Sequence, residues 1–228
     1  MTASCAPILF DLDGTLVDSA RSIASALSAV AIARGGTAID PARVRPLVSQ
    51  GVGMLVATAL ADLAGDSAAD IAAFRTALSS QAADPADFYP GAAETVRALA
   101  AAGHPLAIVT NKPEALGRKL LDELDLLACF GTFVGGDTCR TAKPDPLPLH
   151  HALAAIAPGA QPAKAVMIGD SDVDGFAARA AGCRFVRFTG GYGPASPNAY
   201  PVAGQFAVFA DLQPLLATPM PMAPEQAA

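Results

Sequence analysis

Short apolar runs alternate along the chain with longer stretches in which apolar residues recur every three or four positions. The short runs predict buried strands, and the stretches between them predict amphipathic helices. The runs lie near residues 7–10, 106–110, 132–135, 165–168, 184–188 and 206–209. Because strands and helices alternate, we expect an α/β fold built on a Rossmann-like parallel sheet.

One interval between predicted strands is too long for a simple crossover. Roughly 95 residues separate the first two runs, where a single helix would need far fewer. Helices are expected in this interval, among them one with Ile23 and Leu27 on its apolar face, one with Asp40 as N-cap, and one that carries Phe74 and Leu78. The interval therefore predicts a small all-helical cap domain inserted into the α/β core.

The return from this insertion is expected at the run DPADFYPG, residues 84–91. We accordingly assign residues 1–17 and 88–217 to the core and residues 18–87 to the cap. Residues 218–228 are rich in Pro, Met and Ala and predict a disordered tail.

Charge and composition argue against several classes of protein. The formal net charge is −6 and only four residues are lysines, so a nucleic-acid-binding surface is not expected. No apolar run reaches the roughly 18–20 residues of a membrane span, and the N-terminus lacks the pattern of a secretion signal. The four cysteines are scattered without metal-ligand spacing. We expect a cytoplasmic monomer or homodimer with reduced thiols and no membrane partner.

Two carboxylates, Asp11 and Asp13, follow the first predicted strand. They lie on the same side of an extended stretch, and Gly14 lets the chain turn tightly behind them. Ligands of open α/β sheets bind beyond the carboxyl ends of the strands. Carboxylates this close repel each other, so they either bind a cation or have strongly raised pKa values. A hard divalent cation is the simplest solution.

Residues suited to phosphate chemistry follow the other predicted strands. Thr110 and Asn111 follow the second strand, Lys143 lies in a loop after the third, and Asp170 follows the fourth. Asp11 and Asp170 offer oxygen ligands for Mg²⁺. Thr110 can donate a hydrogen bond to a phosphate oxygen, and Lys143 can neutralise its charge. The ordered set predicts a site that binds a phosphate group together with Mg²⁺.

At these positions the chain resembles the haloacid dehalogenase superfamily of phosphotransferases. Four motifs occur in the order typical of that family: DLDGT, TN, the lysine of KP, and GDSxxD. The resemblance implies that Asp11 attacks phosphorus to form an aspartyl-phosphate, while Asp13 protonates the leaving alcohol and later activates water. It also implies that Mg²⁺ is bound by Asp11, the Asp13 backbone carbonyl and Asp170. Asp174 would support the metal site from a second layer.

The same resemblance implies how the substrate, a small phosphate ester, is held. Thr110 and Lys143 would bind the phosphoryl group, and Asn111 would contribute beside them.

The similarity extends to the phosphoglycolate phosphatases, through FDLDGTLVDSA, QGVGMLVATAL, YPGAAETVRALAAAGH, VTNKP and GGDTCRTAKPDPLPL. The dehalogenase and phosphonatase branches lack an acid where Asp13 stands, and phosphonatases need a cap lysine that the insertion does not contain. A β-phosphoglucomutase-like mutase shares Asp13 but has a histidine where Ile23 aligns. The resemblance thus favours hydrolysis of 2-phosphoglycolate. Another small sugar or carboxylated phosphate, a mutase, and a non-catalytic phosphate-binding protein remain as alternatives.

Substrate selection is expected in the cap at residues 50–54, before an apolar helix at residues 55–63. Gly51 and Gly53 would let backbone N–H groups approach an anion at the helix N-terminus, with Arg45 as the candidate side-chain helper. Closure of the cap would bring these donors over the core site and exclude water.

Four further polar residues have simpler explanations. Asp18 and Ser19 are expected to cap the first helix of the insertion. Asp172 is expected to cap the helix that follows it, and Asp137 either binds a metal ion or forms hydrogen bonds within its loop.

Overall fold

Six parallel strands form one sheet in the order β3-β2-β1-β4-β5-β6. The computed structural model describes residues 5–193, 196 and 198–218. The strands are β1 (Ile8–Phe10), β2 (Leu106–Val109), β3 (Thr132–Val134), β4 (Val166–Gly169), β5 (Arg184–Phe188) and β6 (Gly204–Phe206). The Rossmann-like parallel sheet is therefore confirmed. The chain order reverses at β1, and this reversal opens a crevice at the carboxyl ends of the strands.

The last predicted strand is displaced. Strand β6 ends at Phe206, where the predicted strand began, and Phe209 starts a 3-10 turn, Phe209–Asp211. Phe206 and Phe209 both pack against Phe188 of β5. The apolar run therefore contributes to the core from two elements instead of one strand.

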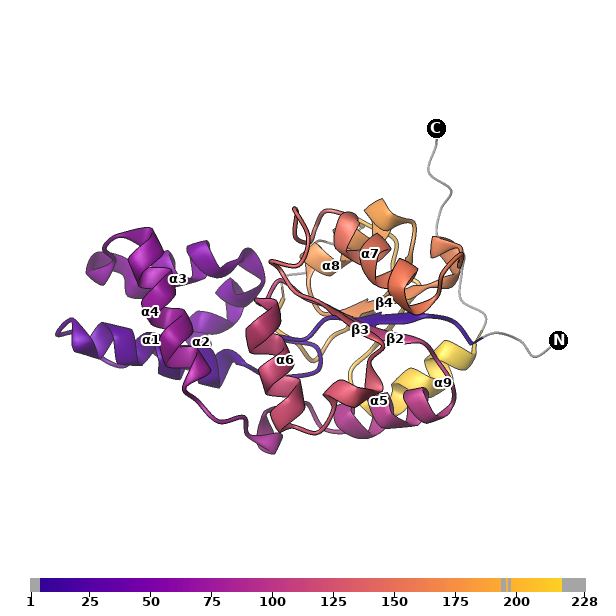
Figure 1. Cartoon of the computed structure of the whole chain (residues 1–228), viewed down its shortest axis with the longest axis horizontal. Coiled ribbons are helices and arrows are strands. Elements are labelled where there is room, and N and C mark those ends of the chain that lie inside the picture. The colour runs from indigo at the N-terminus through magenta and orange to yellow at the C-terminus, as the bar shows by residue number, and fades with distance from the viewer. Residues whose placement is uncertain (1–4, 194–195, 197, 219–228) are drawn as a thin grey trace.

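Helices cover both faces of the sheet (Figure 1). Helices α5 (Ala92–Ala101), α6 (Glu114–Glu123) and α9 (Leu212–Ala217) contribute to the apolar cluster that contains Ile8 and Phe10. Helices α7 (Leu147–Ile156) and α8 (Asp172–Ala181) contribute to the cluster that contains Leu9. Because successive strand residues point to opposite faces, both sides of β1 are buried.

A group of helices lies at one end of the sheet (Figure 1). It comprises α1 (Ala20–Ala33), α2 (Pro41–Val44), α3 (Val52–Leu60) and α4 (Ser67–Ser79). Its members share a separate apolar cluster that includes Leu27, Leu55 and Phe74. Asp40 is the N-cap of α2, as predicted, and its carboxylate accepts a hydrogen bond from the Ala42 amide. This helical cap agrees with the predicted insertion.

The chain enters and leaves the cap through adjacent segments. Val17 pairs with Phe88 in an antiparallel bridge. The Asp18 amide donates to the Asp87 carbonyl at 2.8 Å. The predicted boundaries at residues 18 and 87 coincide with this crossing, although the division into domains remains a prediction.

No single helix within the described ranges is long and apolar enough to cross a membrane. The segments Val52–Leu63 and Ser67–Ser79 reach the required length and composition only as a pair bent by 102°. All four cysteines are free. Most of the predicted tail, residues 219–228, lies outside the described residues.

Candidate active site

Three predicted site residues meet at the carboxyl edge of the sheet because they follow neighbouring parallel strands. Asp11 follows β1, Thr110 follows β2, and Asp170 follows β4. The pairing of Phe10 with both Ile108 and Ile168 aligns these strand ends. All three side chains are buried.

The loop after β1 depends on a glycine. Gly14 has a φ of +87°, and a Cβ atom at this position would lie 2.6 Å from a carboxylate oxygen of Asp170. Its amide donates to the Val17 carbonyl at 2.8 Å, which closes the turn. Only glycine combines this backbone conformation with so close an approach to Asp170.

Lys143 joins two of the carboxylates. Its Nζ lies 2.9 Å from Oδ1 of Asp11 and 2.6 Å from Oδ1 of Asp174. The other oxygen of Asp174 accepts from the amide and hydroxyl of Ser171, at 3.1 and 2.7 Å. With both of its oxygens occupied, Asp174 holds Lys143 beside Asp11.

Asp170 is held by a loop that the sequence did not single out. Its Oδ2 accepts from the amides of Tyr192 and Gly193 at 3.0 and 2.8 Å, and its Oδ1 accepts from the Thr15 hydroxyl at 3.2 Å. These three hydrogen bonds fix a buried carboxylate at the end of β4 next to the turn at Gly14.

The carboxylates carry more negative charge than their surroundings neutralise. Asp11, Asp170 and Asp174 each place an oxygen within 4.8 Å of the others, and Lys143 is the ammonium that bridges Asp11 and Asp174. Burial, reinforced by Asp174, raises the pKa of Asp11 to about 8, although Lys143 opposes the shift. Burial and Asp174 likewise raise the pKa of Asp170 to about 6. Burial alone lowers the pKa of Lys143, but Asp11 and Asp174 outweigh it and raise that pKa.

These residues fit a hard divalent cation. The donor set is all oxygen, and its members are buried within 4.8 Å of one another. Burial and the neighbouring Asp174 raise the pKa of Asp11 and of Asp170, so a positive charge at this position would stabilise both ionised carboxylates. Asp11 and Asp170 are the better candidate ligands, because Asp174 already binds the Lys143 ammonium at 2.6 Å, whereas Asp170 accepts, within the described part of the chain, only from neutral hydroxyl and amide donors.

Asp13 has a partner that sequence analysis missed. Lys112 Nζ donates to both carboxylate oxygens of Asp13, at 3.0 and 3.3 Å, and Lys112 is buried. Hydrophobic periodicity carries no signal for this contact, because residues 111–112 form a bend after β2 and the contact depends on how two loops pack.

Thr110 and Asn111 line the same cavity as Asp11 and Asp13, which measures about 280 Å³ including its solvent-open part. The Thr110 hydroxyl accepts from the Lys112 amide at 3.2 Å. Asn111 Nδ2 donates to the Lys143 carbonyl at 2.9 Å. The Asn111 Oδ1 is buried and has no hydrogen-bond partner among the described residues.

The cap covers this cavity with residues other than those predicted. Val48 and Ser49 of the 3-10 helix Arg45–Gln50 line it, and Gly51 lines the adjoining cavity. The expectation that residues 50–54 precede the helix was wrong, because α3 begins at Val52. Gly53 therefore lies within the first turn of α3, exposed, and outside the residues that line either cavity.

Arg45 joins the cap to the core instead of lining the cavity. Its Nη2 lies 2.5 Å from Asp18, and its guanidinium lies 5.5 Å from the ring centre of Tyr192. The capping predicted for Asp18 was wrong, and for Ser19 only the N-cap position is confirmed. Ser19 occupies the N-cap position of α1 without a capping hydrogen bond, and its hydroxyl contacts the Tyr192 hydroxyl at 3.1 Å. Asp18 thus pairs with Arg45 inside the cap, and Ser19 contacts the core at Tyr192.

Asp172 and Asp137 both form hydrogen bonds within the protein. The predicted N-cap role of Asp172 was wrong, since Ser171 is the N-cap of α8 and Asp172 accepts from Ser196 and from the Tyr200 hydroxyl. Asp137 accepts from the Glu114 amide at 2.8 Å, at the start of α6. The hydrogen-bonding alternative for Asp137 is thus the one observed.

Comparison with known proteins extends over nearly the whole chain. Residues 8–188 match the family model of haloacid dehalogenase-like hydrolases. The phosphoglycolate phosphatase of Rhodospirillum rubrum is 40% identical over 220 residues, which cover 91% of this chain and 88% of that protein. The phosphoglycolate phosphatase of Cereibacter sphaeroides is 37% identical over 218 residues, which cover 92% and 96%. A solved structure described as a predicted phosphoglycolate phosphatase from Haemophilus somnus has a TM-score of 0.77 at 26% identity, covering 94% of this chain and 99% of its own.

Proposed function

The chain belongs to the haloacid dehalogenase-like hydrolase family, and on this premise we propose that it is a Mg²⁺-dependent phosphomonoester hydrolase acting on 2-phosphoglycolate. One arrangement carries the proposal: Asp11 and Asp13 line one cavity with Thr110, and each carboxylate is paired with its own buried lysine. The names of the relatives support the choice of substrate. The products are glycolate and inorganic phosphate.

The reaction divides between the two carboxylates. A carboxylate oxygen of Asp11 attacks phosphorus, the P–O bond to the glycolate oxygen breaks, and Asp13 gives its proton to that oxygen. Asp13 then takes a proton from water as the water attacks the aspartyl-phosphate, which releases phosphate and restores Asp11. Two such displacements replace one more difficult step.

The residues around Asp11 hold the phosphoryl group. Thr110 donates a hydrogen bond to a phosphoryl oxygen, and Lys143 places its charge between the nucleophile and the incoming dianion. Asp11, Asp170 and the Asp13 backbone carbonyl would hold Mg²⁺, which supplies further positive charge when bound. Asp174 keeps Lys143 in position through the contact at 2.6 Å.

The test is phosphate release by the purified chain from 2-phosphoglycolate and from 4-nitrophenyl phosphate, with Mg²⁺ and with excess chelator. We expect turnover of both esters with Mg²⁺ and loss of turnover with chelator. Asp11→Asn should keep the fold and lower kcat by about a thousandfold or more, because a carboxamide is no nucleophile.

Four results would contradict the proposal. Full activity of Asp11→Asn, or full activity in chelator, would remove the nucleophile and metal assignments. Conversion of a hexose phosphate to its isomer, without phosphate release, would favour a mutase. No turnover of a panel of small phosphate esters would favour a phosphate-binding protein. Ranking that panel by kcat/KM tests 2-phosphoglycolate against other small sugar and carboxylated phosphates.

A further inference from the structure

Lys112 lies where the catalytic cavity meets the space beneath the cap. It lines the cavity that contains Asp11 and Asp13, and it also lines the adjoining cavity formed by α1, α3, α4 and α6. Its side chain is only 6% exposed. A buried ammonium in this position faces whatever part of the substrate extends from the phosphoryl site toward the cap.

The two buried lysines of the site have different partners. Lys143 is engaged by Asp11 and Asp174, on the side of the nucleophile. The side chain of Lys112 donates to Asp13 alone among the described residues. An ammonium has three N–H donors, and two of those of Lys112 point to the oxygens of Asp13. One donor is therefore left for a ligand.

Building on the proposed function, we propose that Lys112 binds the carboxylate of the substrate and thereby selects phosphate esters of 2-hydroxy acids. In such an ester a single carbon separates the ester oxygen from the carboxylate. Asp13 must reach the ester oxygen to protonate it, and Lys112 Nζ lies 3.0 Å from an Asp13 oxygen. A substrate placed for proton transfer from Asp13 therefore brings its carboxylate within reach of Lys112.

The surroundings on the cap side favour this ion pair. The adjoining cavity has an open volume of about 450 Å³, and most of the side chains that line it are apolar, among them Ile23, Leu55 and Phe74. An ion pair is stronger where few water molecules screen it. Arg75 is the other cation that lines this cavity, and it is exposed on α4. The carboxylate is thus bound by a core loop, whereas the sequence had predicted binding by glycines of the cap.

The proposal is tested by removing the two charges separately. We would measure kcat/KM for 2-phosphoglycolate and for 2-phosphoglycolamide, whose neutral amide has the shape of the carboxylate, in the wild type and in Lys112→Met. Lys112→Met should lower kcat/KM for 2-phosphoglycolate by roughly 100-fold, mainly through KM, as expected for a buried charge pair. The loss with the amide should be about tenfold smaller, and it measures the effect of removing the partner of Asp13. This design is a double-mutant cycle with the substrate as one partner.

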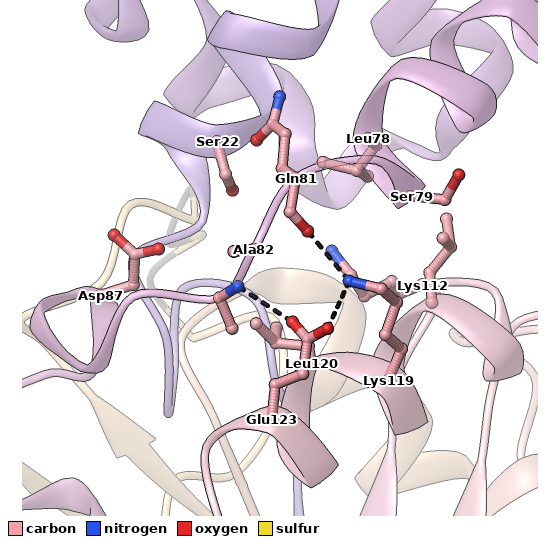
Figure 2. A pocket seen from close by; sticks show the side chains of 12 residues that line it. Ser22, Leu78, Ser79, Gln81, Ala82, Asp87, Lys112, Lys119, Leu120 and Glu123 are labelled. Carbon is pink, nitrogen blue, oxygen red and sulfur yellow. Dashed lines mark hydrogen bonds and ion pairs between the residues drawn. The ribbon is translucent and has the colours of Figure 1, made fainter.

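Two control variants separate the alternatives. Lys119 lines a neighbouring cavity that Lys112 also lines, and its Nζ donates to the Gln81 carbonyl and lies 2.7 Å from Glu123 (Figure 2). Lys119→Met should keep the wild-type preference for carboxylate over amide. Arg75→Met should also keep it, and a loss of preference in this variant would place carboxylate binding at the rim of the cap instead.

Equal losses with both substrates in Lys112→Met would overturn the proposal, because they would show that Lys112 acts only through Asp13. If Lys112→Met does not fold, the wild type still decides, since equal kcat/KM for carboxylate and amide excludes a carboxylate site. Failure of the proposed function is a different result. In that case the wild type would not hydrolyse 4-nitrophenyl phosphate either.

Discussion

The core side and the cap side of the active-site cavity are built differently. On the core side, Asp11, Asp170 and Asp174 are each at most 8% exposed, and each is held by Lys143 or by backbone amides. On the cap side, Val48 and Ser49 line the cavity and are only partly buried. The chemistry is therefore held rigidly by the core, and the cap contributes mainly enclosure. Changes in the core should affect turnover strongly, and changes in the cap should affect stability before turnover.

The largest effect on stability, together with a strong loss of turnover, is expected from Lys143→Met, which tests the core side. This substitution removes the charge between Asp11 and Asp174, so kcat should fall by roughly 100-fold or more. It also leaves two buried carboxylates without their partner, which should cost about 3 kcal/mol in the free energy of unfolding. Steady-state kinetics and urea unfolding measure the two effects independently.

Lys164→Met is the matched control, because Lys164 is exposed and lies outside the cavity. It should leave both quantities unchanged. A loss in kcat below about tenfold for Lys143→Met, equivalent to roughly 1.4 kcal/mol, would assign Lys143 a purely structural role.

The core side was also the part that the sequence predicted well. Asp11, Thr110 and Asp170 could be placed together because each follows a buried apolar run and parallel strands end at one edge. The contact between Lys112 and Asp13 could not be derived in this way, since it depends on how two loops pack side by side. The same holds for Arg45, whose partners come from two different segments of the chain.

The start of α3 shows a second feature that the hydrophobic pattern of the sequence could not predict. Residues 52–54 fit the apolar pattern of a helix as well as that of a loop, so the pattern alone did not fix where the helix begins. Gly51 decides it, because its φ of +91° ends the preceding 3-10 helix and lets α3 begin at Val52. A backbone conformation of this kind follows from tertiary packing and cannot be read from hydrophobic periodicity.

An intermediate effect is expected from alanine at the two cap glycines. Gly51→Ala forces a side chain into a backbone region that is nearly exclusive to glycine, which should lower the free energy of unfolding by about 2 kcal/mol. Gly53→Ala should raise it by about 0.5 kcal/mol, because Gly53 is helical and a Cβ there meets no atom within 4 Å. Urea unfolding measures both.

The KM for 2-phosphoglycolate should change by less than about threefold in both variants, because the cap only encloses the substrate. A large rise in KM for Gly53→Ala would restore the original assignment of substrate binding to this segment.

The smallest effect is expected from Asp70 in the cap. Hydrogen bonds from Arg34, at 2.6 Å, and from the Gly65 amide, at 2.7 Å, hold the pKa of Asp70 below its ordinary value. As the pH falls, Asp70 therefore becomes protonated in the unfolded chain before it does so in the folded chain. The stabilisation that ionised Asp70 gives to the folded state is complete above the unfolded pKa near 3.9 and is lost as the pH falls through the folded pKa. Asp70→Asn should be less stable than the wild type at pH 7, and the difference should shrink below pH 4.

Asp62→Asn serves as the control for pH dependence, because Asp62 forms no ion pair among the described residues. The free energy of unfolding of Asp62→Asn should equal that of the wild type at pH 7 and below pH 4. If the difference in the free energy of unfolding between Asp70→Asn and the wild type is the same at pH 7 and below pH 4, the charge of Asp70 does not cause that difference.

The bridge between Val17 and Phe88 gives the molecule a modular construction. The segments at Val17 and Phe88 pair like the two strands of a hairpin, and the whole cap forms the loop between them. The entropy cost of closing such a loop rises only slowly with its length. On the proposed division into core and cap, a longer or shorter cap would fit at this junction without disturbing the sheet. Lys112 lies outside the cap. A cap grafted from a relative would change how the site is enclosed, while the preference for a carboxylated ester would stay with the core.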